Sequence, residues 1–279
     1  MIQNQILKLT SNNRNGKMQK VKSFSSQILG FLSVFFLIHS SAYTAELLGQ
    51  WLLDDSNGKK VEDSSGQKND GEIIGKAKWV DGKFGKAIEF DGATAGIKIS
   101  PGLSLKEFST VLWVNSSEEW GIKRTELWCG SQTYGDAVLI RGDERPDWKK
   151  GEAMLHWTDG AGWYAIGSGK LKSKTWYHLA ATFDGKTLKF YKNGKLAGEK
   201  NSTIGAGNAD TFIGAHPIPT NFFQGVIDDV AIFDDALTTE EIQNIVDRGL
   251  EKRLYIEVAN KKAIHWAKIK ASSSSVNLK

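Results

Sequence analysis

The sequence predicts an all-β protein, a sandwich of two antiparallel sheets with one short helix near the C-terminus. Short apolar runs recur along the chain, each bounded by Gly, Asp or Ser, which is typical of β-strands. Glycine is abundant, at 29 residues, and proline is scarce, at four, which suits tight turns between antiparallel strands. Asp184-Gly185 and Asn193-Gly194 fit hairpin turns whose central residues need positive φ, so they predict a three-stranded meander over 176–200.

The remaining elements follow in chain order. We expect strands at 46–54, 87–90, 96–99 and 109–114, and two more at 210–214 and 225–233. The strand at 176–183 has no strongly charged face, which indicates a position inside the sandwich. A helix begins at Thr238 with the capping box Thr-Thr-Glu-Glu and stops at Gly249. The basic extension 251–279 has strand-like alternation at 254–258 and 263–269 and a disordered Ser-rich end.

An ordered set of motifs carries a family resemblance. The motifs are WYHLAATFDG, LKFYKNGK, FIGA and GVIDDVAIFDDALTTEEI, preceded by LGQWLLDD, VEDSSGQKNDG and FGKAIEFDG. Together they resemble the laminin-G-like, concanavalin A-like jelly-roll domains of bacterial secreted proteins, pentraxins and lectins, and they cover one domain at 46–250. The resemblance implies a two-sheet jelly roll. It leaves function open, because this sandwich carries lectins, adhesins, glycosidase partners and spacers.

The first 45 residues read as a secretory signal peptide. They contain five basic residues and no acidic residue, then an apolar run at 28–38 and small residues at 40–45. The run is shorter than the roughly 20 residues of a membrane-spanning helix, so an uncleaved anchor is the lesser alternative. We therefore expect a secreted or extracytoplasmic protein, in the periplasm or at the cell surface, without stable membrane insertion after cleavage at Ala42 or Ala45.

Charge and cysteine content narrow the functional classes. Without the signal peptide the chain has 31 basic and 32 acidic residues, and 46–250 has 24 basic against 30 acidic residues. This balance provides no general field for nucleic acid, which we exclude as a partner. Cys129 is the only cysteine, so no intramolecular disulfide forms, and a small packed residue is its simplest interpretation.

A structural calcium ion is the sharpest hypothesis for a site. The DSSGQKND sequence places Asp63, Ser64, Asn69 and Asp70 in a turn-rich loop whose backbone carbonyls could join carboxylates around a hard cation. Lectin-like members of the family often hold calcium between an early loop and the last strand, so the resemblance implies Asp228 as the distant ligand. We expect Asp228 on the strand face of Val230 and Ile232, where a carboxylate needs a partner. The alternative is a side-chain-capped turn without metal.

Carbohydrate binding is the second hypothesis, motivated by ten tryptophans that are dense in the central region. Flat aromatic faces stack on sugar rings. Polar flanks make Trp148 and Trp163 the best candidates for exposed aromatics, with Tyr164 beside them. Asp143 and Arg145 would supply directional hydrogen bonds. The alternative is that half or more of the central aromatics fill the core.

Enzyme activity is not predicted. Glycosidases of this fold place two carboxylates on one strand face, whereas Glu118 and Glu119 are adjacent and the acids at 143–147 lie in a loop sequence. We expect a secreted non-catalytic recognition module, for a glycan in first place. A protein-binding adhesion, matrix or spacer module is the alternative, and a glycoside hydrolase is the least favoured.

Overall fold

The computed structural model describes residues 45–55, 57–100, 106–121, 125–133, 136–142, 151–204, 210–216 and 220–251. At 130–133 and 136–138 it describes the backbone only. The predicted signal peptide, 1–45, and the predicted extension, 251–279, lie outside the described residues apart from Ala45 and Glu251. Both assignments therefore stay predictions.

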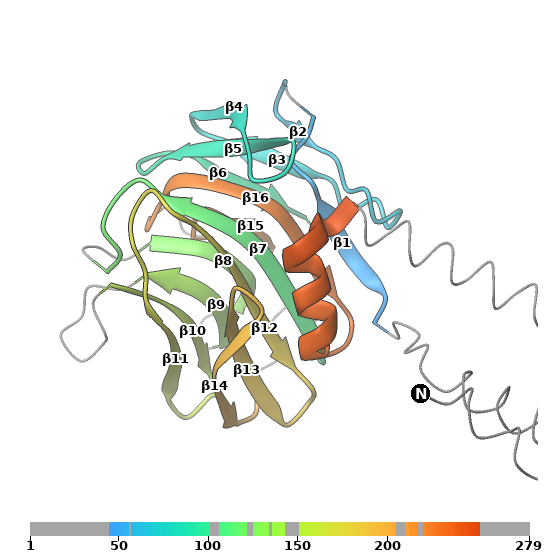
Figure 1. The fold of residues 1–279 in the computed structure, drawn as a ribbon, viewed down its shortest axis with the longest axis vertical. Helices are drawn as coiled ribbons and strands as arrows, with labels where there is room; N and C mark the ends of the chain where they lie inside the picture. The colour runs from blue at the N-terminus through green and yellow to red at the C-terminus, as the bar shows by residue number, and fades with distance from the viewer. Residues whose placement is uncertain are drawn as a thin grey trace, which may run out of the picture. The chain divides into compact units, whose positions relative to one another are not determined.

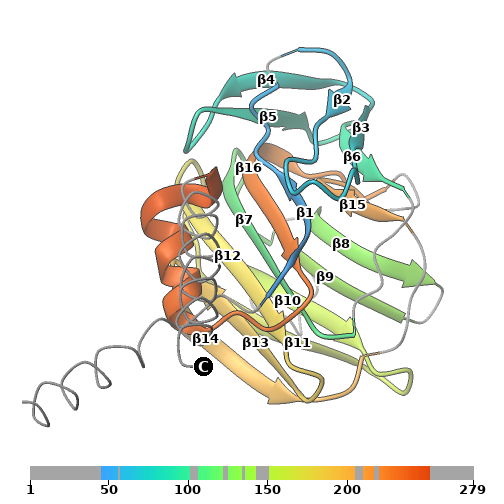
Figure 2. The ribbon, with the colours of Figure 1, turned by 90° about the vertical axis from the view of Figure 1, so that its right-hand side faces the viewer.

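The described strands form two antiparallel sheets of eight strands each, which confirms the predicted sandwich (Figures 1 and 2). The first sheet has the order β14 (Lys195–Asn201), β13 (Thr187–Lys192), β12 (Trp176–Phe183), β7 (Phe108–Ser116), β16 (Gln224–Phe233), β5 (Lys86–Asp91) and β4 (Ala77–Asp81), with β1 (Leu47–Trp51) also paired to β16. The second has the order β11 (Trp163–Lys170), β10 (Glu152–Thr158), β9 (Asp136–Gly142), β8 (Thr125–Thr133), β15 (Thr211–Ile213), β6 (Gly96–Ile99), β3 (Gly71–Ile74) and β2 (Lys60–Val61).

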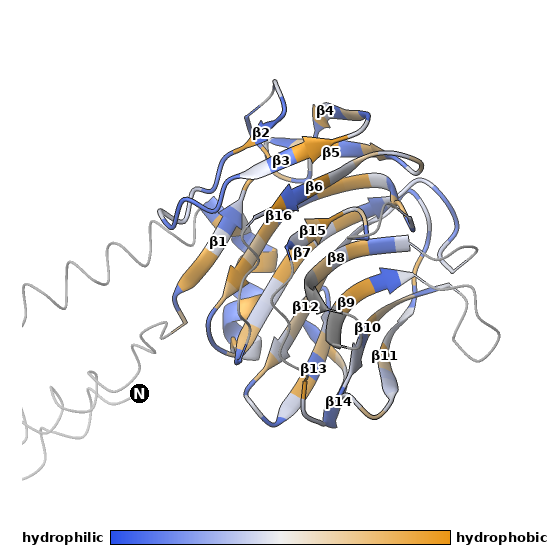
Figure 3. Ribbon diagram, turned by 180° about the vertical axis from the view of Figure 1, so that it is seen from behind, coloured by the Kyte–Doolittle hydropathy of each residue, from blue (hydrophilic) through white to orange (hydrophobic). Residues whose placement is uncertain are grey.

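The main core lies between the two sheets. Alternate residues of the central strands point inward, as in Leu112 and Val114 of β7 or Leu179 and Ala181 of β12. Both hydrophobic and hydrophilic residues occur along most strands, as Figure 3 shows. The largest wholly buried side chains include Trp51, Trp128 and Trp157. Much of the tryptophan content therefore supports the fold rather than a surface.

The meander at 176–201 has the predicted strands, but its two turns differ. Asn193 and Gly194 both have positive φ, at 49° and 77°, as expected for the tighter hairpin. In 184–186 only Gly185 has positive φ, at 80°. There the Asp184 carboxylate accepts hydrogen bonds from the amides of Lys186 and Thr187 at 3.0 and 2.7 Å. The Asp-Gly pair thus closes a longer turn capped by a side chain.

The predicted helix spans 239–251 within the described part of the chain and covers the outer face of the first sheet (Figure 2). Its capping box is present, with the Thr238 hydroxyl accepting from the Glu241 amide and the Glu241 carboxylate accepting from the Thr238 amide. Ile242 and Ile245 pack on Val111, Ala180 and Phe233 in a second cluster. Gly249, the predicted stop, has the left-handed φ of 76°, but the helix continues to Glu251, the last described residue.

Candidate functional site

The β10–β11 hairpin carries the most exposed aromatic side chain described. The register pairs His156 with Ala165 and Thr158 with Trp163. The turn between the strands is fixed by Asp159, whose carboxylate accepts from the amides of Ala161 and Gly162, each at 2.9 Å. These hydrogen bonds lower the pKa of Asp159, so the turn keeps its capping charge under mild acid. The position of Trp163 is therefore set by a rigid turn.

Trp163 lies flat over its neighbouring strand. Its ring centroid is 4.5 Å from that of His156 and the two planes differ by 18°. His156 is 2% exposed, whereas Trp163 is 47% exposed. Because the imidazole covers one face of the indole, the exposed area lies on the opposite face and the edges. The result is a stacking platform supported from below, which we call the Trp163–His156 platform.

Tyr164 does not share this platform, although we predicted the two aromatics together. Adjacent strand residues point to opposite faces, so Tyr164 turns toward the other sheet. Its ring lies 5.7 Å from Trp157, and the Lys200 ammonium of β14 lies 4.1 Å above it. The Trp157 indole N–H donates to the Ser202 hydroxyl at 2.9 Å. Tyr164 and Trp157 thus belong to the margin between the sheets, and Trp163 alone faces outward.

The other predicted sugar-contacting residues, Asp143, Arg145 and Trp148, lie outside the described residues. Of the remaining central tryptophans, Trp120, Trp128 and Trp157 are buried, at 5%, 0% and 0% exposure. The alternative that such aromatics fill the core is confirmed for these three. Trp163 is the predicted platform residue that the structure finds exposed.

The sequence interpretation missed a buried ion pair on the same sheet face. Glu126 and Arg141 are cross-strand partners, both 0% exposed, with Arg141 Nη1 3.5 Å from Glu126 Oε1. Arg141 is paired in register with Met154, two residues from His156 on the same face of β10. The sequence signal for this ion pair was strand alternation: Ile140 points into the main core, so Leu139 and Arg141 on either side of it share the opposite face. Both side chains are wholly buried, so the pair lies beneath the surface and does not form an accessible part of the platform.

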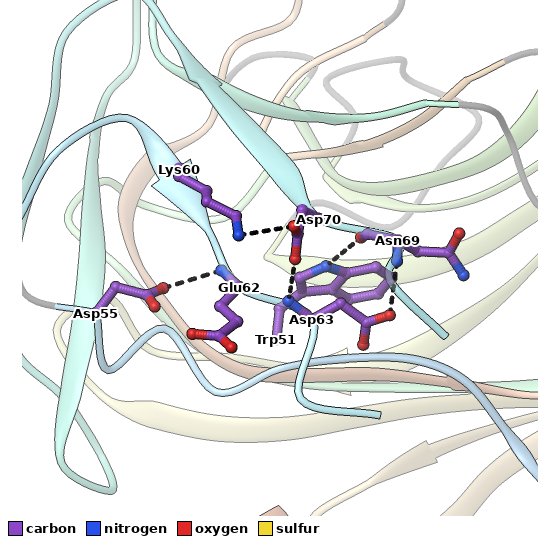
Figure 4. A network of polar contacts seen from close by, with 7 residues as sticks. All are labelled: Trp51, Asp55, Lys60, Glu62, Asp63, Asn69 and Asp70. Carbon is purple, nitrogen blue, oxygen red and sulfur yellow. Dashed lines mark hydrogen bonds and ion pairs between the residues drawn. The ribbon is translucent and has the colours of Figure 1, made fainter. Parts of the chain in front are cut away.

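The loop at 63–70, where we predicted calcium ligands, is held by hydrogen bonds to backbone groups of the loop itself and of β1 (Figure 4). The Asp63 carboxylate accepts from the amides of Gln50, Ser65 and Asn69, each at 2.9 Å. The Asn69 side-chain amide donates to the Leu48 backbone carbonyl at 2.7 Å. The Asn69 backbone carbonyl accepts from the Trp51 indole N–H at 2.9 Å. Three of the four lone-pair positions of Asp63 are thereby used, which leaves little capacity for a cation.

Asp228 is held by a different loop. A bulge between Asp228 and Ala231, with Asp229 at a φ of 47°, changes the alternation of β16. Asp228 is paired with Trp113, whose neighbours Leu112 and Val114 point into the core, so Asp228 faces outward. The expectation that it shares the face of Val230 and Ile232 was wrong for this reason.

The Asp228 carboxylate accepts from the amides of Lys83 and Phe84, at 2.7 and 2.9 Å, and burial raises its pKa to about 7. Burial, and then repulsion by Asp228, raises the pKa of Asp229 to about 7. Among the described residues, no group of three or more His, Cys, Asp or Glu side chains is arranged to hold a metal. Calcium binding stays a prediction.

Comparison with models of protein families assigns the chain to a superfamily. Residues 91–243 match the family model described as the concanavalin A-like lectin/glucanases superfamily. The chain belongs to this superfamily. A search of the curated proteins gave no significant match.

Solved structures share the concanavalin A-like fold. Domain 4 of an extracellular family 43 arabinanase from Geobacillus stearothermophilus, solved in complex with arabinotriose, is 25% identical, with a TM-score of 0.61 over 72% of this chain and 98% of that one. The receptor binding domain of botulinum neurotoxin type G is 13% identical, with a TM-score of 0.57, and the binding domain of Paraclostridial Mosquitocidal Protein 1 is 15% identical, with a TM-score of 0.55. Each toxin alignment covers 72% of this chain and 51% of the toxin chain, about half its length, and these two likenesses show the fold alone.

No helix among the residues that the structure describes is long and apolar enough to cross a membrane.

Proposed function

We propose that this protein is an extracytoplasmic, non-catalytic module that binds carbohydrate through the Trp163–His156 platform. The observation that carries the proposal is the flat, supported indole, which is 47% exposed and lies 4.5 Å from the imidazole beneath it. A sugar ring presents C–H groups on one face, and these pack against an aromatic face. Because His156 and the Asp159-capped turn fix the indole before binding, little side-chain freedom is lost when a sugar stacks on it.

The surroundings of the platform support this assignment. Ala165 and Gly167 follow Trp163 on the outer face of β11, so no large side chain stands beside the indole along that strand. The arabinanase domain, which was solved with arabinotriose, is a relative at 25% identity that aligns over nearly its whole length. That likeness supports a sugar ligand without giving its identity.

The proposal is tested by titrating the purified full chain against a panel of polysaccharides and oligosaccharides that includes arabinan, xylan and β-glucan. Trp163→Ala is the diagnostic variant. Removal of one aromatic stacking surface is expected to weaken binding roughly tenfold or more. Trp79→Ala is the matched control, because it removes another part-exposed indole and Trp79 lies on β4, at the opposite edge of the first sheet from β14.

Saturable binding that is lost in Trp163→Ala and kept in Trp79→Ala supports the proposal. A blank panel with a folded protein refutes it and favours protein recognition instead. Binding that survives Trp163→Ala unchanged refutes the platform. Release of reducing ends from any panel member would overturn the non-catalytic part.

A further inference from the structure

Basic charge is concentrated in one segment of the domain. Residues 170–200 contain eight lysines and two acidic residues, whereas the rest of 46–250 contains 16 basic and 28 acidic residues. The eight lysines are Lys170, Lys172, Lys174, Lys186, Lys189, Lys192, Lys195 and Lys200. A cationic region therefore lies within an otherwise acidic domain, and its sign selects for anions.

The fold gathers part of this charge along the margin where the edge strands β11 and β14 run beside each other, which we call the β11–β14 margin (Figures 1 and 2). At one end Lys200 lies over Tyr164, the residue that follows Trp163. At the other end the Lys192 ammonium donates to the Lys170 carbonyl at 3.4 Å. Residues 164–170 of β11 span about 20 Å at the usual rise of an extended strand.

Lys170, Lys192 and Lys200 have no carboxylate within 4.0 Å in the described part of the chain. Of the eight lysines, Lys189 alone has a carboxylate within 4.0 Å there, that of Glu199. Lys170 and Lys200 are exposed and Lys192 is half-buried. The ammonium groups of Lys170 and Lys200 are therefore open to an external anion, and Lys192, whose ammonium donates to the Lys170 carbonyl, adds positive charge beside them. The attraction of this charge for an anion falls as salt is added.

The platform and the margin adjoin each other across a single strand. Trp163 faces outward from β11, while Tyr164 and Lys200 lie on the opposite side of the same strand. Because β11 is an edge strand, a chain-like ligand can cross it and reach both surfaces. We propose that the ligand is a polyanionic glycan, a uronate or sulfated polysaccharide whose sugar stacks on Trp163 and whose charges meet Lys200, Lys192 and Lys170. This inference rests on the proposed function.

A glycan fits these surfaces better than a nucleic acid does. The basic area is confined to one region, and the rest of 46–250 carries an excess of twelve acidic residues, which repels a long duplex that extends past the margin. The ring platform adds a contact that a duplex, whose bases are already stacked inside it, does not use. Nucleic acid and anionic lipid surfaces therefore become outcomes of the test.

The experiment measures binding of the full chain to heparin and polygalacturonate, with arabinan and dextran as neutral polymers. Double-stranded DNA and vesicles containing phosphatidylserine are the non-glycan polyanions. The variants are Trp163→Ala and the triple substitution Lys170→Gln/Lys192→Gln/Lys200→Gln. The matched control is Lys59→Gln/Lys76→Gln/Lys106→Gln, which removes three exposed lysines elsewhere. Each titration is repeated at low and high salt.

We expect an anionic glycan to bind more tightly than any neutral one. The triple margin variant should lose roughly tenfold or more in affinity, as three exposed ion pairs would contribute. Trp163→Ala should lose a similar amount, the control triple variant should lose little, and added salt should weaken binding to the anionic polymers alone.

The two proposals fail in different ways. Binding of neutral glycans through Trp163, with no preference for anionic ones, overturns this inference and keeps the proposed function. Equal binding of heparin, DNA and vesicles that is independent of Trp163 overturns the glycan class in favour of general polyanion binding. Absence of binding to every glycan overturns both.

Discussion

The adjacent acids Asp228 and Asp229 should make stability fall as pH rises toward 8. Asp228 is 0% and Asp229 3% exposed, and their carboxylates accept backbone amides of the 83–84 loop and of Leu250. Burial raises the pKa of each to about 7. The folded state therefore holds protons that the unfolded chain, with ordinary aspartate pKa values near 4, has released.

The sign and size follow from this difference. The contribution is fully present below about pH 4 and is lost as pH rises through about 7. Each pH unit inside that window changes the free energy of unfolding by about 1.4 kcal/mol for one carboxylate, so the loss from pH 5 to pH 8 is on the order of 2–3 kcal/mol per carboxylate and about twice that for the two together. His178 acts in the opposite direction, because burial lowers its pKa to about 3 and its contribution is lost as pH falls below 6.5. The wild-type curve alone would mix the two effects.

The assay compares wild type with Asp228→Asn/Asp229→Asn by urea unfolding, followed by tryptophan fluorescence at pH 5, 6, 7 and 8. Asparagine keeps an oxygen that accepts the backbone amides, and it tolerates the left-handed φ of 47° at position 229. Because His178 is present in both proteins, its effect cancels in the difference. Because the variant removes both titrating groups, it should gain about 4–6 kcal/mol relative to wild type between pH 5 and pH 8.

Exposed Glu240→Gln controls for the loss of negative charge. A wild-type-to-variant difference that stays constant within about 0.5 kcal/mol over the four pH values would refute the raised pKa values. So would an equal pH dependence in the Glu240 control.

Three further outcomes are expected. Asp63→Ala should lower the free energy of unfolding by about 3 kcal/mol or more, because three backbone amides lose a charged acceptor. Asp63→Asn should lower it by less, and equal losses in the two variants would contradict this account. If calcium binds the native state, its addition should raise the melting temperature and chelator should lower it, and unchanged melting would end the calcium hypothesis. Trp163→Ala should change unfolding free energy by less than about 1 kcal/mol, since its indole is half exposed, so that a large destabilisation would show a structural role for the platform.

The sequence predicted the parts of the fold that depend on local patterns. The meander at 176–201 and the helix at 239–251 follow from turn residues, alternation and a capping box, which are read within a few positions. In the first sheet, strands that are far apart in the chain lie side by side, because β12 pairs with β7 and β7 pairs with β16. The family resemblance implied a two-sheet jelly roll, but neither it nor the local patterns were used to predict this strand order.

The candidate site was harder to predict from the sequence, because it depends on how β10 and β11 are paired. Trp163 was expected to be exposed from its polar flanks, but its support by His156 needs the diagonal contact across β10 and β11. The separation of Trp163 from Tyr164 follows from strand alternation once 163–170 is known to be a strand. The outward direction of Asp228 was not predictable, because a bulge adds one residue to β16 without a mark that distinguishes Asp228-Asp229 from regular alternation.

The basic β11–β14 margin is an example of a surface property that can be predicted directly from the sequence. Strands β12, β13 and β14 are neighbours both in the chain and in the sheet, so a local excess of lysine becomes a local excess of charge in space. A cation site built from Asp63 and Asp228 would instead need residues 165 positions apart to meet, which depends on the pairing of every intervening strand. The structure gives each of those carboxylates its own backbone amides. For that reason the anionic-glycan hypothesis depends on fewer long-range contacts than the calcium hypothesis.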